Sequence, residues 1–138
     1  MQPQKGDVIF ARYATIGTVC YVDTENDFLV SYACVTVKPD RRKLNGKYLF
    51  YYFKSNAFLE EVKQFVNSNT QGNVGIEALY KTKITVPELE EQGAIVNFLD
   101  NKCSQIDSTI GNRLKAIKSL EQYKKSLTYE VVTGKREV

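Results

Sequence analysis

The residues best suited to recognise a ligand form a polar run at 67–73 that holds only amides, hydroxyls and one glycine. Asparagine and glutamine side chains can form a paired set of hydrogen bonds with the edge of an adenine base. Glycine lets a backbone approach such a base closely. The candidate contacts in this run are Ser68, Asn69, Thr70, Gln71, Gly72 and Asn73. The same composition is also typical of a helix cap and turn, and both interpretations stay open.

A second candidate is the cationic run Arg41, Arg42 and Lys43, which follows Pro39-Asp40 and is expected in a loop. Such side chains can neutralise the phosphates of a nucleic acid. The formal net charge is +3, and the basic surplus lies before residue 88, which modestly favours a polyanionic partner there. A solvated charge run is an equal alternative. The aromatic run at 48–53 could stack on bases, although its helical spacing favours core packing.

Enzymatic chemistry has little support, because the chain contains no histidine, the commonest general base and metal ligand. Cys20, Cys34 and Cys103 are scattered among apolar residues, so we expect small core side chains rather than metal ligands or a redox pair. We therefore expect no catalytic residue, metal or cofactor. No apolar run approaches the roughly eighteen residues of a membrane span, and no signal peptide pattern is present. We expect a cytoplasmic protein with no membrane partner.

The elements that must position these candidates predict an α+β fold. Short apolar runs at 7–11, 18–22 and 28–37 predict consecutive antiparallel strands, with a loop between the first two that turns at Gly17. Asn45 can cap a helix at 47–53, and Ser55 or Asn56 can cap a second that runs to Val66. A helical turn at 74–79 and a half-buried strand at 80–86 complete a small domain, 1–87.

Residues 88–138 are expected to form a second region, built on one long helix from Glu88 to Val131. Apolar residues recur there at alternating spacings of three and four, the pattern of a coiled-coil seam. The seam residues that we expect to pair are Leu99, Ile106, Ile110, Ile117, Leu120 and Leu127. Pro87 suits the helix start and Gly134 a left-handed cap at its end. Two shorter helices, broken at Gly93 or Gly111, are the alternative.

Taken in order, these pieces resemble the specificity subunit of type I restriction and modification systems. Residues 6–17 (GDVIFARYATIG) are similar to that family's G-D-I-L-x-x-R-x-G-T-I-G stretch, with Ala14 at its glycine. Residues 70–73 stand where its T-Q-x-N loop belongs. Residues 84–92 (ITVPELEEQ) resemble I-P-L-P-P-L-E-E-Q at the junction of a target-recognition domain with its helix, and 128–135 (TYEVVTGK) resemble the helix ending.

The resemblance implies a non-catalytic subunit that reads one half of a bipartite site in double-stranded DNA. Residues 1–87 would be the C-terminal part of a target-recognition domain, with Arg12, Tyr13 and Thr15 as contacts beside the polar and cationic runs above. Residues 88–138 would be a spacer and dimerisation helix that pairs with another specificity half or a second copy. The expected further partners are the methyltransferase (modification) and the restriction and translocase subunits.

Two antiparallel helices, each roughly 66 Å long, would hold two recognition domains about two turns of B-form DNA apart. A coiled-coil module that binds only proteins is the alternative function, and it would show no affinity for DNA.

Overall fold

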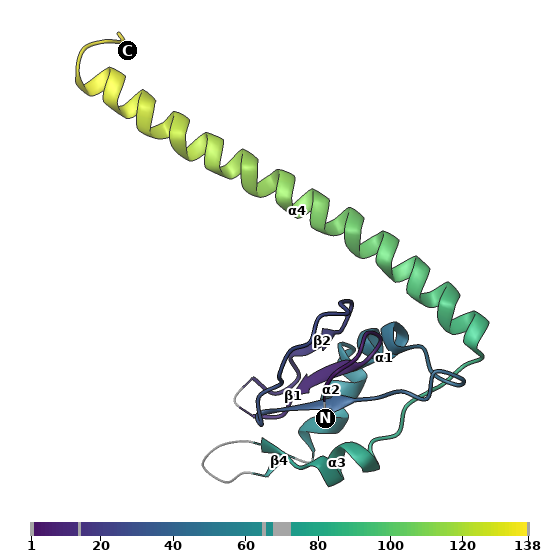
Figure 1. Cartoon of the computed structure of the whole chain (residues 1–138). Helices are drawn as coiled ribbons and strands as arrows, with labels where there is room; N and C mark the ends of the chain where they lie inside the picture. Colours follow the sequence, from purple (N-terminus) through teal and green to yellow (C-terminus); the bar gives the residue numbers. More distant parts are fainter. Residues whose placement is uncertain (1, 14, 65, 68–72, 138) are drawn as a thin grey trace. The chain divides into compact units, whose positions relative to one another are not determined.

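The computed structural model describes residues 2–13, 15–64, 66–67 and 73–137 of the chain. The chain divides into two compact units, Met1–Asn97 and Phe98–Val138. The first unit contains a three-stranded sheet with helices packed on it, and the second is the greater part of a long helix (Figure 1). These elements confirm the predicted α+β fold with a long C-terminal helix.

The sheet is antiparallel and places strand β1 (Val8–Ala11) between β2 (Val19–Tyr21) and β3 (Cys34–Val37). Val8 pairs with Tyr21 on one side and with Val37 on the other. The loop between β1 and β2 turns at Gly17, as predicted, with φ +90°. The backbone conformation favours glycine there, and a Cβ at Gly17 would also lie 2.7 Å from Leu59 Cδ2, which would have to shift.

Two short helices, α1 (Gly46–Phe53) and α2 (Asn56–Lys63), supply most of the remaining core. The predicted caps are confirmed, since the side chain of Asn45 accepts from two backbone N–H groups of α1 and that of Ser55 accepts from Phe58 N–H. Phe10 of β1 meets Phe53 and Phe58 edge-on, and these two rings stack on each other at 4.4 Å. The aromatic run of α1 is therefore largely core, as its spacing favoured.

The predicted strand at 28–37 is too long, because only Cys34–Val37 forms β3. A turn replaces its first part, where Cys34 N–H donates to Ser31 O at 3.0 Å and Ala33 N–H to Ser31 Oγ at 3.3 Å. Ser31 thus satisfies these backbone donors locally, and strand β3 begins only at Cys34.

The predicted strand at 80–86 is wrong. Tyr80 belongs to helix α3 (Ile76–Lys81), and no strand is assigned to 82–88. Side chains take the place of a strand partner there, since Tyr48 Oη donates to Thr85 O at 2.8 Å and Lys83 N–H donates to Glu61 Oε1 at 3.2 Å. The alternation of polar and apolar residues in this stretch does not reflect sheet pairing.

The cysteines are also not the core residues that we expected, because Cys20 and Cys103 are exposed and Cys34 is half-buried. Val19 and Tyr21 pack against the core. Strand alternation therefore turns Cys20 to the opposite face. Cys103 lies on the long helix, on its seam.

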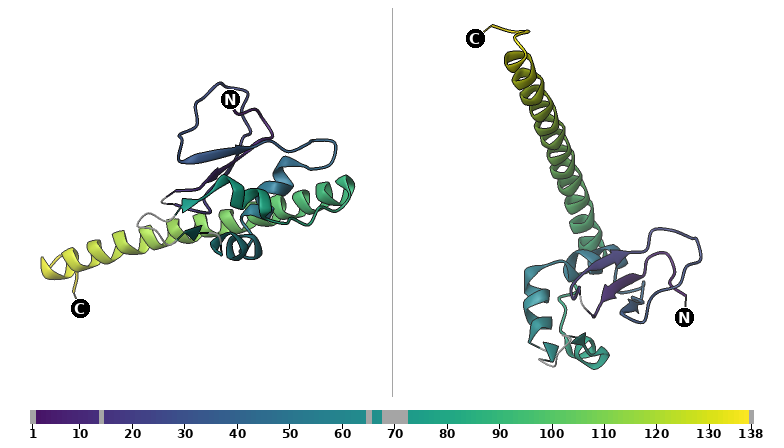
Figure 2. Two further views of the ribbon diagram at one scale, coloured as in Figure 1. Left: turned by 90° about the horizontal axis from the view of Figure 1, so that it is seen from below. Right: turned by 90° about the vertical axis from the view of Figure 1, so that its left-hand side faces the viewer.

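Helix α4 (Leu89–Val132) is 44 residues long and passes through Gly93 and Gly111 without a break (Figure 2). The alternative of two shorter helices is therefore excluded. Its C-terminus has the predicted glycine cap: Gly134 has φ +70°, and Lys135 N–H donates to Glu130 O at 2.8 Å. Several apolar residues of this helix are exposed in the single chain, among them Ile106, Ile110, Leu114, Ile117 and Leu120.

The first turns of α4 belong to the first unit and are held by Gln92, whose side chain is fully buried. Its Oε1 accepts from Asn45 N–H at 2.7 Å, and its Nε2 donates to Lys43 O at 2.9 Å and Pro87 O at 2.7 Å. One amide therefore links the cationic loop, the cap of α1 and the start of α4.

Candidate nucleic-acid interface

Backbone pairing brings two of the predicted contact segments together where β1 ends. Arg12 N–H donates to Ala33 O, and Arg12 O accepts from Val74 N–H, both at 3.0 Å. An isolated antiparallel bridge then joins Tyr13 to Asn73, in strand β5 (Asn73–Val74). Strand β5 pairs with β4 (Val66–Asn67), so the ends of the polar run are a two-stranded ladder that is tied to Tyr13. Ser68–Gly72, the rest of the predicted run, lie outside the described residues.

Three side chains gather next to this bridge, and we call Arg12, Tyr13 and Tyr32 the aromatic clamp. The Arg12 guanidinium lies over the Tyr13 ring, with Cζ 4.7 Å from the ring centroid. The Tyr13 ring meets the Tyr32 ring at 6.2 Å in an edge-on arrangement. Arg12 Nη2 also donates to Tyr32 O at 3.4 Å. The guanidinium therefore contacts the ring of Tyr13 and the backbone carbonyl of Tyr32.

The charge of Arg12 has no carboxylate partner among the residues that the structure describes. Its Nε is buried and, within the same residues, makes no hydrogen bond. A guanidinium forms its strongest contacts with carboxylates and phosphates, so this arrangement leaves capacity for an external anion. Thr15, the third predicted contact in this loop, is exposed and forms a turn with its backbone, where its carbonyl accepts from Thr18 N–H at 3.0 Å.

The cationic run Arg41–Lys43 lies at the other end of β1 and does not join the clamp. Arg41 Nη2 donates to Lys5 O and lies 4.0 Å from the carboxylate of the buried Asp7, which directly precedes β1. Arg42 forms two side-chain hydrogen bonds with Asp40, both at 3.0 Å. These bonds lower the pKa of Asp40 and raise the pKa of Arg42. Both arginines thus have internal partners.

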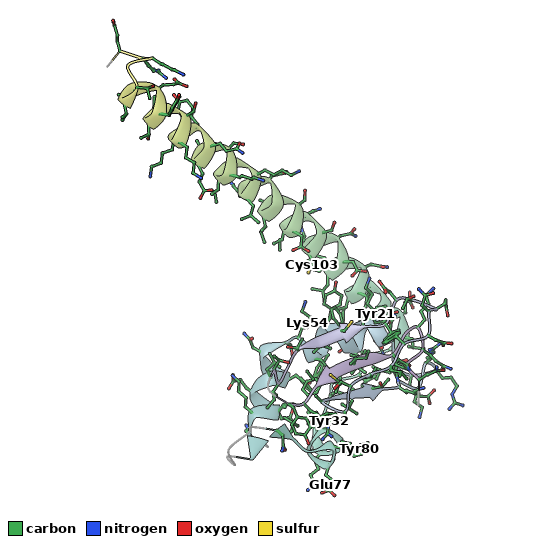
Figure 3. The ribbon with its side chains drawn as sticks, turned by 60° about the vertical axis from the view of Figure 1, so that its left-hand side comes forward. Tyr21, Tyr32, Lys54, Glu77, Tyr80 and Cys103 are labelled. Atoms are coloured by element: carbon green, nitrogen blue, oxygen red, sulfur yellow. The ribbon has the colours of Figure 1, made fainter. Side chains whose placement is uncertain are left out.

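Sequence reasoning did not select Tyr32 or Gln92. Tyr32 was placed inside a strand, whereas it stands in the turn before β3 with 85% of its surface exposed (Figure 3). Ser31, a frequent turn former within that apolar run, was the available signal. Gln92 ends the motif at 84–92, and no pattern in the sequence indicates that its amide is buried.

Nothing among the described residues resembles a metal centre, since no group of three or more potential ligands among His, Cys, Asp and Glu is close enough to hold an ion. In the same described part of the chain, none of the helices combines the length and the hydropathy needed to cross a bilayer.

Several known proteins are similar to this chain in sequence or in fold. A family model described as the type I restriction modification DNA specificity domain matches residues 1–119. A type I restriction enzyme specificity subunit of Haemophilus influenzae is 28% identical over 127 residues, covering 92% of this chain and 31% of that protein. The MjaVIII specificity subunit of Methanocaldococcus jannaschii is 30% identical over 93 residues, covering 67% of this chain and 21% of that protein.

The fold is likewise that of a known structure, the HsdS subunit from Thermoanaerobacter tengcongensis. The two chains are 22% identical with a TM-score of 0.72, over 94% of this chain and 34% of the other. This chain thus spans between a fifth and about a third of the proteins that it matches. Because the family model covers most of its length, the chain belongs to the family of the type I restriction modification DNA specificity domain.

Proposed function

We propose that this chain is a non-catalytic DNA-specificity module that reads one half of a bipartite site in double-stranded DNA. The observation that carries this proposal is the bridge between Tyr13 and Asn73, which sets an anion-binding guanidinium beside the predicted base-reading run. Phosphate contacts fix the register of a protein on DNA, and amide contacts with base edges select the sequence. The family match over residues 1–119 supports a role in DNA specificity.

The proposal extends to the organisation of the chain and to its partners. Residues 1–87 are the recognition part, and 88–138 are the spacer that meets a second recognition part. Methyltransferase and restriction or translocase subunits dock on the assembled module, because the relatives named above are specificity subunits of type I restriction enzymes. We place this assembly in the cytoplasm, with the DNA that it reads.

The partner of helix α4 is a second copy or another specificity half, paired through the seam. In a parallel pair, Arg113 would face Arg113 and Lys124 would face Lys124 of the other helix, because identical seam positions meet. Like charges in one layer are unfavourable. An antiparallel pair places different seam positions opposite each other and separates these cations, which favours the antiparallel arrangement.

One antiparallel register of two copies uses all of the free seam. Val96 is buried within the first unit, so the free seam begins at Leu99 and ends with the helix at Val131. Setting Leu99 opposite Val131 of the second copy leaves no position unpaired. The layers are then Leu99 with Val131, Cys103 with Leu127, Ile106 with Lys124, Ile110 with Leu120 and Arg113 with Ile117.

Flanking residues support the same register. Lys102 lies near Glu130 of the second copy, so opposite charges meet on one side of the pair. The exposed Leu114 meets its own counterpart close to the two-fold axis. A shift by one heptad separates Lys102 from Glu130. In one direction, the shift also brings the C-terminal end of one helix opposite Gln92 and Val96 of the second copy, which are already buried in that copy's first unit.

The test of the proposed function is reconstitution with modification subunits and a library of random-sequence duplex DNA. We expect methylation at a single bipartite motif that depends on this chain. Asn73→Ala should relax the sequence preference at one base pair while leaving methylation elsewhere in the motif intact, with a cost of about 1–3 kcal/mol at that pair. If methylation has the same pattern with and without the chain, the proposal is wrong and the protein-binding coiled coil is the better reading.

A further inference from the structure

We propose that Tyr32 is a DNA-contacting residue whose ring packs on the sugar–phosphate backbone, next to a phosphate that Arg12 holds. This inference rests on the function proposed above and adds a residue to it that neither the motifs nor the family match identifies. In this proposal the aromatic clamp contacts the sugar–phosphate backbone of the DNA, and the predicted polar run contacts the bases.

The exposure of Tyr32 is the first reason. The side chain is 85% exposed, and Leu29 of the same loop is 89% exposed, so the loop offers two large apolar groups to a partner. The core does not need the Tyr32 ring, because the buried cluster is complete without it. A large exposed aromatic side chain next to an arginine and a second aromatic ring is typical of a contact surface rather than of a structural position.

The second reason is that the backbone at Tyr32 is positioned before any partner binds. The Tyr32 carbonyl accepts from Arg12, and Ser31 fixes the turn through Ala33 and Cys34. The ring itself meets Tyr13 at one edge. Ordering a segment on binding normally reduces affinity, and a turn that is already formed avoids part of that cost.

The third reason is the combination of chemistry. Arg12 supplies a cation with no carboxylate partner among the described residues, Tyr13 supports the guanidinium from one side, and Tyr32 adds an apolar face with a hydroxyl donor. A matching ligand carries an anion directly beside an apolar ring. A nucleotide unit has this form, since a phosphate is joined to a deoxyribose. The bridge to Asn73 then places such a unit next to a residue that is predicted to contact a base edge.

The experiment uses the full chain assembled with its modification subunits. Two labelled DNA duplexes are compared: one contains the motif that the assembled complex methylates, and the other has a random sequence. The variants are Tyr32→Ala and Tyr32→Phe. Tyr80→Ala is the matched control, because Tyr80 is 84% exposed on α3 and takes no part in the clamp. Figure 3 labels both tyrosines in the lower part of the first unit.

We expect Tyr32→Ala to weaken binding of both duplexes by about tenfold, the scale of one aromatic contact with a nucleotide. The dependence of affinity on salt should not change, because no charge is lost. Tyr32→Phe should keep most of the affinity, since the ring face remains. Tyr80→Ala should bind as the unsubstituted complex does.

Four results would overturn the inference while leaving the proposed function in place: no effect of Tyr32→Ala, an equal loss in Tyr80→Ala, a loss confined to the motif duplex, or an equal loss in Tyr32→Phe. Weaker assembly with the modification subunits at unchanged DNA affinity would make Tyr32 a protein contact instead. If the unsubstituted complex binds neither duplex, the proposed function fails and this inference with it.

Discussion

Tyr48 is the residue whose ionisation is most clearly linked to folding. Burial raises its pKa above the ordinary 10.0, and the nearby Tyr52 and Glu91 add to the shift. The folded state therefore favours the neutral phenol, which donates to Thr85 O at 2.8 Å. A raised pKa of an acid stabilises the fold below the unfolded pKa, and this contribution is lost as the pH rises through the folded pKa.

We expect the free energy of unfolding to fall as the pH is raised above about 10. Tyr48→Phe should cost about 1 kcal/mol at neutral pH through the lost hydrogen bond, and it should flatten the alkaline decrease. Urea unfolding across this pH range measures both effects. Tyr129→Phe, at an exposed site of α4, is the control and should leave the decrease unchanged. An equally steep decrease in Tyr48→Phe would assign it to other groups.

The arginines should differ in their effect on DNA binding. Arg12→Ala should lower the slope of log affinity against log salt by about 1, because it removes a cation that lacks a carboxylate partner among the described residues. Arg42→Ala should lower it by less, since Asp40 already holds that guanidinium. Titrations at several salt concentrations give both slopes. A larger effect of Arg42 would identify the Arg41–Lys43 loop as the main phosphate contact.

Residue types alone predicted which groups could bind DNA, but they could not predict which groups the fold had already paired. Arg12 and Arg42 are the same residue type, and both stand outside the named helices and strands. Their difference depends on Asp40 lying two residues from Arg42, and on Tyr32, twenty positions away in the chain, meeting Arg12. The contact between Asp40 and Arg42 is local and can be predicted from the sequence. The contact between Tyr32 and Arg12 depends on the register of β1 and β3.

At the scale of elements, helices with strong local signals were predictable and short strands were not. Asn45, Ser55 and Gly134 act as caps within a few residues of their helices, so local sequence was sufficient. The seam of α4 repeats often enough to specify one long helix. The stretch at 80–86 alternates as a strand does, yet tertiary contacts from Tyr48 and Glu61 bind its backbone and no strand forms.

Gln92 is the residue on which the start of α4 depends. Gln92→Leu would leave Asn45 N–H, Lys43 O and Pro87 O without their present partner in a buried site, and each unsatisfied group costs about 1–3 kcal/mol. We expect a clear loss in the free energy of unfolding measured in urea. Gln122→Ala, at an exposed site of the same helix, should change it by less than about 0.5 kcal/mol. Similar small effects of both variants would show that the amide network is dispensable.

For the whole molecule, the exposed seam of α4 predicts self-association, because a long apolar stripe in water is unfavourable. We expect the chain to form dimers in sedimentation equilibrium. Ile106→Asp with Ile110→Asp should give monomers, since a buried charge costs several kcal/mol. Lys115→Asp with Lys118→Asp changes the same number of residues at positions off the seam and should leave the dimer intact. A wild-type chain that stays monomeric at about 100 μM would contradict seam pairing between copies.

The register can be tested with the native Cys103, which faces Leu127 of the second copy in the proposed arrangement. In a background of Cys20→Ser and Cys34→Ser, Leu127→Cys should give a covalent dimer on mild oxidation, because disulfides form only between closely facing residues. Leu120→Cys should not, since Leu120 faces Ile110. Crosslinking of Leu120→Cys instead would indicate a shift by one heptad, and efficient crosslinking through Cys103 alone would indicate a parallel pair. Coverage of the whole free seam is what distinguishes the proposed register from its neighbours, so the crosslinking pattern tests it directly.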